Sequence, residues 1–157
     1  MSEVLTRRCP TEKDTLALGA RIGERLGRGD LLSLHGPLGA GKTVLVRGIA
    51  AGAGADPERV RSPTFVLHSV YQGGSMLLHH LDLYRLGPGA DVTFLDIEGL
   101  LESGAVVVEW GELADLSRFA PMHVTFDVEA GNVRVISREP ASSAAIAGAW
   151  AAVPAKA

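Results

Sequence analysis

The sequence predicts an α/β fold in which a mixed β-sheet is flanked by helices. A continuous apolar run such as residues 105–108 is typical of a buried strand. Apolar residues recur at helical spacing over residues 16–26 and 91–102, which predicts two helices. Two pairs of strand-like segments are each joined by a short glycine-containing loop, which predicts antiparallel hairpins and therefore a mixed sheet. These pairs are residues 66–71 with 76–84 and residues 123–129 with 133–138.

Residues 36–43 match the phosphate-binding P-loop pattern G-x-x-x-x-G-K-[ST]. A short apolar strand is predicted before them at 30–35 and a helix after them at 44–50, which is the context that the motif requires. Its glycines allow successive backbone N–H groups to converge on one anion. Lys42 would reach the β- and γ-phosphates, and the Thr43 hydroxyl would bind Mg²⁺. The sequence therefore predicts a P-loop NTPase-like sheet that binds a nucleoside triphosphate. The expected nucleotide-binding residues are Gly36, Leu38, Gly39, Ala40, Gly41, Lys42 and Thr43.

Length and composition agree with one soluble domain. The chain has 157 residues, of which 46% are hydrophobic and 21% charged. We expect a P-loop domain over residues 1–139 and an Ala- and Ser-rich tail over 140–157 that is flexible or a frayed helix. A net charge of −3 gives no general attraction to nucleic acid. The single cysteine, Cys9, permits no disulfide within this chain. With no signal-peptide pattern and no membrane-spanning apolar stretch, we expect a cytoplasmic protein without membrane contact.

The first predicted helix begins at Thr11. This residue can cap the helix, with Asp14 three residues later completing a variant of the capping box. The turn at residues 27–30 ends the helix before the P-loop strand. The helix is expected to pack on the sheet, and its N-terminus is also a candidate neighbour of the nucleotide base.

Two carboxylates are candidates for chemistry beside the P-loop. Glu109 follows the apolar run 105–108, so it should emerge at the edge of the sheet where ligands bind. A P-loop enzyme needs such a carboxylate near Mg²⁺. Asp82 lies in an apolar strand, where an unpaired carboxylate is costly to bury. It could hold a metal-bound water, polarise the attacking water, or form a structural ion pair with Arg85.

Other polar residues give weaker signals. Thr64 lies in a Ser-Pro-Thr-Phe segment after the P-loop helix, the place of γ-phosphate-sensing loops in many nucleotidases, although such a segment is more often a turn. His79 and His80 are adjacent on a strand and therefore face opposite sides. We expect one of them to be packed and the other to face solvent. Trp110 is either a rim aromatic or a residue that gates the site or binds a partner.

In their order along the chain, these motifs strongly resemble those of the bacterial TsaE (YjeE) family. The resemblance covers roughly residues 5–138. Besides the P-loop, it rests on Arg47-Gly48, Ser62-Pro63-Thr64-Phe65, His80-Leu81-Asp82-Leu83-Tyr84-Arg85-Leu86 and Val108-Glu109-Trp110. It implies a P-loop ATPase with a mixed sheet that hydrolyses ATP slowly and is stimulated within a complex of TsaD and TsaB. That complex transfers threonylcarbamoyl to N6 of adenosine 37 in tRNA, so tRNA would be met indirectly, through the complex. TsaE is thought to reset or support the complex between cycles.

The resemblance also implies a role for each matching residue. Lys42 would bind phosphate, and Thr43 and Glu109 would bind Mg²⁺. Asp82 would be required for hydrolysis, and Thr64 would belong to a switch-like loop. With Lys42, these two form the expected catalytic set, and the expected cofactors are ATP and Mg²⁺.

Pro37 departs from the family pattern, which usually has Asp after the first P-loop glycine. Proline removes one backbone N–H and fixes φ. Because the anion-binding nest depends mainly on later N–H groups, we expect nucleotide binding to survive. Any role of the family's Asp in water positioning would be lost here.

Two other functions share the same P-loop: a small-molecule kinase and a non-catalytic nucleotide-binding adaptor. Small kinases usually add an arginine-rich lid over the γ-phosphate. No such cluster is visible in the sequence, and the nearest arginines, Arg59 and Arg61, precede the Ser-Pro-Thr segment. The accessory ATPase is therefore the favoured hypothesis.

Overall fold

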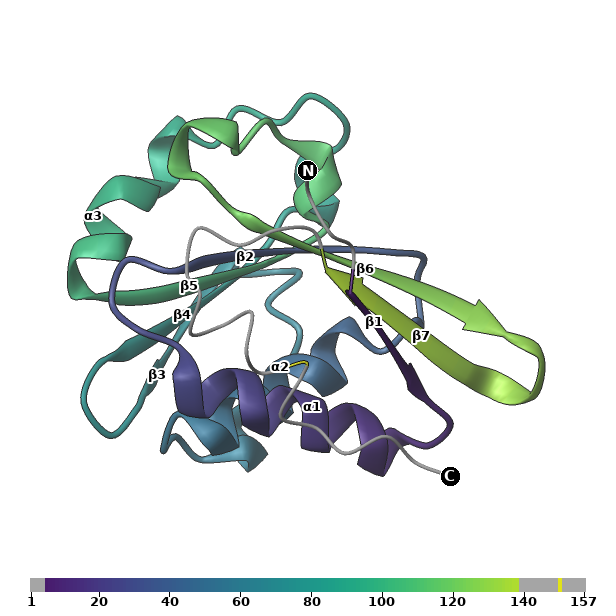
Figure 1. Cartoon of the computed structure of the whole chain (residues 1–157). Helices are drawn as coiled ribbons and strands as arrows, with labels where there is room; N and C mark the ends of the chain where they lie inside the picture. The colour runs from purple at the N-terminus through teal and green to yellow at the C-terminus, as the bar shows by residue number, and fades with distance from the viewer. Residues whose placement is uncertain (1–4, 139–149, 151–157) are drawn as a thin grey trace.

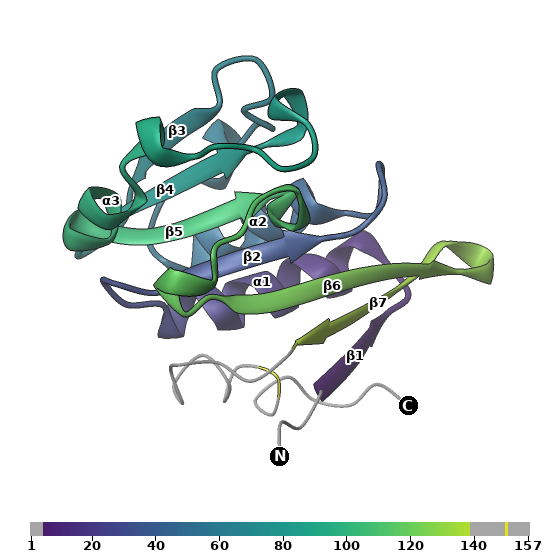
Figure 2. The ribbon, with the colours of Figure 1, turned by 90° about the horizontal axis from the view of Figure 1, so that it is seen from above.

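The computed structural model describes residues 5–138 and residue 150. Within that part of the chain, seven strands form one sheet in the order β1-β7-β6-β2-β5-β4-β3 (Figure 2). The strands are β1 (Leu5–Cys9), β2 (Leu31–His35), β3 (His68–Gln72), β4 (Leu77–Asp82), β5 (Gly104–Glu109), β6 (Met122–Glu129) and β7 (Val133–Arg138).

The sheet is mixed, as the sequence predicts. The central strand β2 pairs in parallel with β5 and β6, and β4 pairs in parallel with β5. The hairpins β3–β4 and β6–β7 are antiparallel, and β1 adds to β7 in the antiparallel sense. The ends of β2, β4 and β5 therefore lie at the same edge of the sheet, next to the P-loop.

Helices cover both faces of the sheet (Figure 1). Helices α1 (Glu12–Arg25) and α2 (Lys42–Gly52) lie together on one face, and α3 (Ile97–Ser103) lies on the other. Apolar side chains form a core on each side of the sheet, the larger one beneath α1 and α2. Among the described residues, no helix is long and apolar enough to cross a membrane.

Helix α1 begins with the predicted capping box. The Thr11 hydroxyl accepts a hydrogen bond from the Asp14 N–H, and the Asp14 carboxylate accepts one from the Thr11 N–H. These two bonds satisfy donors that the first turn of a helix otherwise leaves unpaired. The start of α1 is thereby fixed beside the P-loop.

Glycines bring α1 and α2 into backbone contact. A Cβ atom on Gly19 would lie 2.5 Å from the Leu45 carbonyl oxygen, and one on Gly48 would lie 2.4 Å from that of Leu16. Gly23 also faces the α2 backbone, because a Cβ there would lie 2.1 Å from the Ile49 oxygen. Only glycine permits so close an approach, so these residues set the position of α2 and of the P-loop at its start.

Two elements differ from the sequence prediction. Strand β1 was not expected, since five residues at an edge carry little periodicity. The helix expected over residues 91–102 is wrong in its first half, where a short 3₁₀ turn at residues 93–95 precedes α3. Asp96 separates them: it adopts a left-handed conformation with φ of 50°, and its carboxylate accepts a hydrogen bond from the Gly99 N–H as the cap of α3.

The proposed boundary between domain and tail falls where residues 139–149 and 151–157 lie outside the described structure. Trp150 is described and is buried in the larger core. Its indole N–H donates to the Ile136 carbonyl at 3.4 Å, and Arg7 donates to the Trp150 carbonyl at 2.5 Å. One residue of the predicted tail therefore packs against β1 and β7.

Candidate functional site

The P-loop connects the end of β2 to the start of α2. The φ values are 152° for Gly36, 78° for Gly39 and 100° for Gly41. Residues that carry a Cβ atom rarely adopt such values. Pro37 fits this loop, since its carbonyl accepts a hydrogen bond from the Ala40 N–H at 3.2 Å. The backbone therefore has the glycine-dependent curvature predicted from the sequence.

Lys42 is buried and folded back onto the loop. Its Nζ donates to the carbonyl oxygens of Gly36 at 2.5 Å and Pro37 at 3.0 Å. The same ammonium lies 3.8 Å from the centre of the Trp110 ring, a cation–π contact. Burial lowers the pKa of Lys42, while the carboxylates of Glu112, Glu109 and Asp82 act in the opposite direction.

Thr43 and Glu109 meet at the start of α2. The Thr43 hydroxyl lies 2.9 and 3.0 Å from the two carboxylate oxygens of Glu109. Glu109 is the last residue of β5 and is 3% exposed. Strand β5 is buried along its whole length, so it delivers the carboxylate to the position that the sequence predicts.

Asp82 lies beside Glu109, because the two are paired residues in the parallel strands β4 and β5. One oxygen of Asp82 accepts hydrogen bonds from the hydroxyls of Ser62 at 2.7 Å and Thr64 at 3.0 Å. The other oxygen accepts from the Tyr84 N–H at 2.9 Å. The loop containing Thr64 is thus tied to the strand that carries Asp82.

The alternative ion pair between Asp82 and Arg85 does not occur among the described residues. The Arg85 guanidinium instead lies 5.3 Å from the centre of the exposed Phe65 ring. Asp82 is therefore stabilised by neutral donors and remains directed toward the P-loop.

The expectation that one histidine of the adjacent pair faces solvent is wrong. Both His79 and His80 are buried, at 3% and 0% exposure, because each face of β4 is covered. His79 contacts His68 and Ser103, away from the P-loop. His80 contacts the Glu109 carboxylate at 2.5 Å.

The sequence reasoning missed two charged residues that contact the P-loop. Arg134 of β7 donates to the carbonyl oxygens of Ala40 at 3.2 Å and Gly39 at 3.1 Å. Glu112 accepts a hydrogen bond from the Gly36 N–H at 3.2 Å. Glu112 comes three residues after Glu109, a weak clue, but Arg134 gave no signal because it comes from a distant hairpin.

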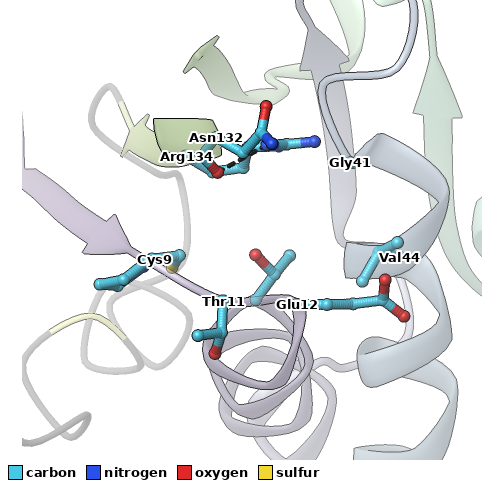
Figure 3. A pocket seen from close by; sticks show the side chains of 9 residues that line it. Cys9, Thr11, Glu12, Gly41, Val44, Asn132 and Arg134 are labelled. Atoms are coloured by element: carbon cyan, nitrogen blue, oxygen red, sulfur yellow. Dashed lines mark hydrogen bonds between the residues drawn. The ribbon is translucent and has the colours of Figure 1, made fainter. Parts of the chain in front are cut away.

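Two hollows adjoin at Gly41. One has a volume of about 510 Å³ and is lined by the P-loop, Thr64, Glu109 and Trp110. The other, of about 300 Å³, lies between the start of α1 and the β6–β7 hairpin. Figure 3 shows Asn132 and Arg134 on one side of the smaller hollow and Thr11 and Glu12 on the other.

Most of the predicted site residues line the larger hollow, and Gly36 and Asp82 do not. The larger hollow is lined by Leu38, Gly39, Ala40, Gly41, Lys42, Thr43, Thr64 and Glu109, and Asp82 contacts its wall through Thr64. Leu38 is 80% exposed, so its side chain forms the rim rather than the floor. The start of α1 and the P-loop both line the smaller hollow. This position is the one required if the start of α1 lies near the nucleotide base.

Comparisons with known proteins show which proteins the chain is similar to. The family model described as "Threonylcarbamoyl adenosine biosynthesis protein TsaE" matches residues 9–138. A relative from Mycobacterium tuberculosis, the tRNA threonylcarbamoyladenosine biosynthesis protein TsaE, is 44% identical over 116 residues, which are 68% of each chain. The protein of that name from Streptomyces coelicolor is 46% identical over 98 residues, 60% of this chain and 66% of the relative.

The fold is also similar to a solved structure. The crystal structure of Bacillus subtilis YdiB superimposes with a TM-score of 0.72 at 25% identity, over 90% of this chain and 88% of that one. The mixed sheet with its P-loop is thus a P-loop NTPase fold. Because the family model covers most of the sequence, the chain belongs to the TsaE family of tRNA threonylcarbamoyladenosine biosynthesis proteins.

Proposed function

We propose that this protein is an accessory ATPase that binds ATP with Mg²⁺, hydrolyses it slowly, and acts with a TsaD–TsaB complex in threonylcarbamoylation of adenosine 37 in tRNA. The contact between the Thr43 hydroxyl and the Glu109 carboxylate carries the nucleotide part of the proposal. It brings two oxygen ligands to the start of a helix whose loop is shaped for phosphate. Family membership supports the pathway.

The donor set fits magnesium. Thr43 and Glu109 offer hard oxygen atoms, which Mg²⁺ prefers, and the Nε2 atom of the neighbouring His80 is already engaged with Glu109. Magnesium bound there would neutralise charge on the phosphates. The chain's own part is to hold the Glu109 oxygens and the Thr43 hydroxyl within reach of the β- and γ-phosphates.

The larger hollow is the proposed place of the phosphates, and the smaller one that of the nucleoside. Phosphate oxygens would attract Lys42 away from the carbonyls of Gly36 and Pro37. Asp82 would orient the attacking water, since its carboxylate lies beside Glu109 and is held by Thr64 from the switch-like loop. Thr64 would respond to the γ-phosphate through the same bond.

The partner complex is proposed from the family, with tRNA met through that complex in the cytoplasm. A kinase would need arginines over the γ-phosphate. In the described part of the chain, Arg134 is the only arginine lining the larger hollow, and it is engaged with loop carbonyls. This supports hydrolysis over transfer to a small molecule.

The test is ATP turnover by the purified protein, alone and with purified TsaD and TsaB. We expect slow phosphate release that rises when both partners are present. Lys42→Ala should lower turnover roughly 10²- to 10³-fold, because it removes a charged donor to the phosphates. No stimulation, together with a newly phosphorylated small molecule, would overturn the accessory role in favour of a kinase. Binding without any turnover in the presence of both partners would favour the adaptor.

A further inference from the structure

A chain of buried hydrogen bonds runs from the proposed metal carboxylate into the neighbouring strand. His80 Nε2 lies 2.5 Å from a Glu109 oxygen, and His80 Nδ1 lies 2.9 Å from the Tyr71 hydroxyl. The Tyr71 hydroxyl oxygen also lies 3.4 Å from the Arg61 carbonyl oxygen. Tyr71 belongs to β3, His80 to β4 and Glu109 to β5, so the chain crosses three strands.

The protonation pattern along this chain is set by Glu109. An ionised carboxylate only accepts hydrogen bonds, so the hydrogen between it and His80 is carried by Nε2. In a neutral ring, Nδ1 then accepts the hydrogen of the Tyr71 hydroxyl. Tyr71 thereby selects the tautomer and the ring orientation that allow His80 to donate to Glu109.

The burial of these groups leaves them few other partners. His80 is fully buried and Tyr71 is 6% exposed. A buried polar group that loses its partner is costly, which holds the ring and the carboxylate in one arrangement. Glu109 is therefore contacted by His80 at one carboxylate oxygen and by Thr43 at both.

The far end of the chain reaches the switch-like loop. Arg61 immediately precedes Ser62, whose hydroxyl donates to Asp82. The Arg61 carbonyl therefore contacts the Tyr71 hydroxyl of β3, and Ser62 hydrogen-bonds Asp82 of β4. A shift of the loop would act directly on Asp82 and, through the contact with Tyr71, on the His80–Glu109 pair.

We propose that His80 and Tyr71 are positioning residues that hold the Glu109 carboxylate in the orientation required for magnesium–nucleotide binding and connect it to the loop of residues 61–64. The inference rests on the proposed magnesium–nucleotide function and assigns these two side chains a role in it. Neighbours that orient a metal ligand typically contribute 10- to 100-fold to metal affinity.

His79 is a matched control. It precedes His80 on the same strand, is equally buried, and has two partners, His68 Nε2 at 2.9 Å and the Ser103 hydroxyl at 2.8 Å. It faces the opposite side of the sheet from Glu109. Substitution at either position removes a buried, hydrogen-bonded histidine. Only the substitution of His80 also removes a contact with the Glu109 carboxylate.

The experiment compares His80→Leu, His80→Gln, Tyr71→Phe and His79→Leu with the unsubstituted protein. Calorimetry would measure binding of a non-hydrolysable ATP analogue with Mg²⁺ and with EDTA, and thermal unfolding would report stability. We expect His80→Leu to raise the Mg²⁺ concentration needed for half-maximal binding by about 10- to 100-fold. His80→Gln should recover most of the affinity, because its side-chain amide can donate from the position of Nε2. Tyr71→Phe should cause a smaller loss in the same direction, and His79→Leu should leave the magnesium requirement unchanged.

The outcomes separate the inference from the function on which it rests. Equal magnesium requirements in His80→Leu and His79→Leu would overturn the inference while leaving the nucleotide function intact. If His80→Leu does not fold, Tyr71→Phe and His80→Gln decide: an unchanged magnesium requirement in both overturns the positioning role. If the unsubstituted protein binds the analogue equally in Mg²⁺ and EDTA, the proposed metal function fails, and the inference fails with it.

Discussion

Asp82 is a buried carboxylate that forms no ion pair with another described residue and is held by hydrogen bonds. It is 1% exposed and accepts three hydrogen bonds, from Ser62, Thr64 and the Tyr84 backbone. Hydrogen bonds to a charged group contribute more than those between neutral groups, which offsets part of the cost of burial. Because these donors are neutral, the negative charge is available to the site beside Glu109.

Asp82→Asn should therefore separate chemistry from folding. The amide oxygen can still accept the Tyr84 N–H, and the amide group can donate to the hydroxyl oxygens of Ser62 and Thr64. If Asp82 orients the attacking water as proposed, hydrolysis should fall by roughly 10²- to 10⁴-fold, because the side chain has lost its charge. Single-turnover phosphate release and thermal unfolding would measure the two effects. If the Asp82→Asn variant shows no cooperative thermal unfolding transition, the carboxylate is required for folding instead.

Some site residues could be predicted from the local sequence, whereas others depend on which strands pair in the sheet. Glu109 and Asp82 could be identified because each is a charged residue at or in an apolar run. A charge in such a place is costly to bury, so the sequence alone marks it as a candidate. His80 and Arg134 could not, because their roles depend on which strands become neighbours. Pairing of β4 with β5 and of β7 with β6 is a property of the whole sheet.

At the scale of elements, the α1–α2 contact determines where the P-loop helix sits. Four glycines lie in this contact: Gly19, Gly23, Gly48 and Gly52. In sequence they reduce helix propensity by about 1 kcal/mol each relative to alanine. Their presence in two regular helices is explained by the backbone approach that they permit. The sequence predicted both helices from their periodicity but could not predict this distance.

Gly19→Ala is expected to destabilise the protein although it improves helix propensity. The new Cβ would lie 2.5 Å from the Leu45 carbonyl oxygen, so α1 and α2 must separate. We expect a loss of about 1–3 kcal/mol in the free energy of unfolding, measured by urea denaturation. Gly27→Ala is the control, because its Cβ would meet only the Asp30 carboxylate at 3.4 Å. A Gly19→Ala protein at least as stable as its parent would contradict the tight contact.

The β3–β4 hairpin carries a pH-dependent element, the contact between His68 and His79. Burial lowers the pKa of both imidazoles from the ordinary value of 6.5. The neighbouring His80 lowers the pKa of His68 further, and His68 lowers the pKa of His79 further. The unfolded chain therefore binds more protons than the folded protein as pH falls below that value. Their contribution to stability is complete above the ordinary pKa and decreases as the pH falls through it.

This linkage predicts a smaller pH effect when both rings are removed. The free energy of unfolding of the parent protein should decrease between about pH 7.5 and about pH 5.5. In the double variant His68→Gln, His79→Gln, the decrease should be smaller, since neither amide titrates in that range. Urea denaturation at the two pH values would measure it. Parallel pH dependences in the two proteins would rule out the histidine pair as a source.

At the scale of the whole molecule, Trp150 joins a residue near the C-terminus to the edge of the sheet. It is 2% exposed, and its ring lies 5.9 Å from the Arg138 guanidinium. Its hydrogen bonds reach Arg7 and Ile136, on β1 and β7. This contact could not be predicted from the sequence, because a single tryptophan in an Ala- and Ser-rich segment has no periodicity.

Trp150→Ala should lower the free energy of unfolding by about 3–5 kcal/mol, as for other large buried aromatic residues. Trp150→Phe should lose less, because the ring would still fill most of the space. Denaturant unfolding would measure both variants. The buried position of Trp150 would be contradicted if alanine and phenylalanine variants were equally as stable as the parent.

The bonds that Lys42 makes within the loop have a consequence for the kinetics of binding. In the proposed function, a nucleotide would compete for an ammonium that already has two carbonyl partners and an aromatic ring. The affinity for the nucleotide would then reflect the contacts that Lys42 gains with the phosphates minus those that it loses within the loop. The loop would have to release Lys42 before the phosphates are fully bound. Association is accordingly expected to proceed in two steps, so the observed rate should level off at high ATP concentration instead of rising in proportion to it.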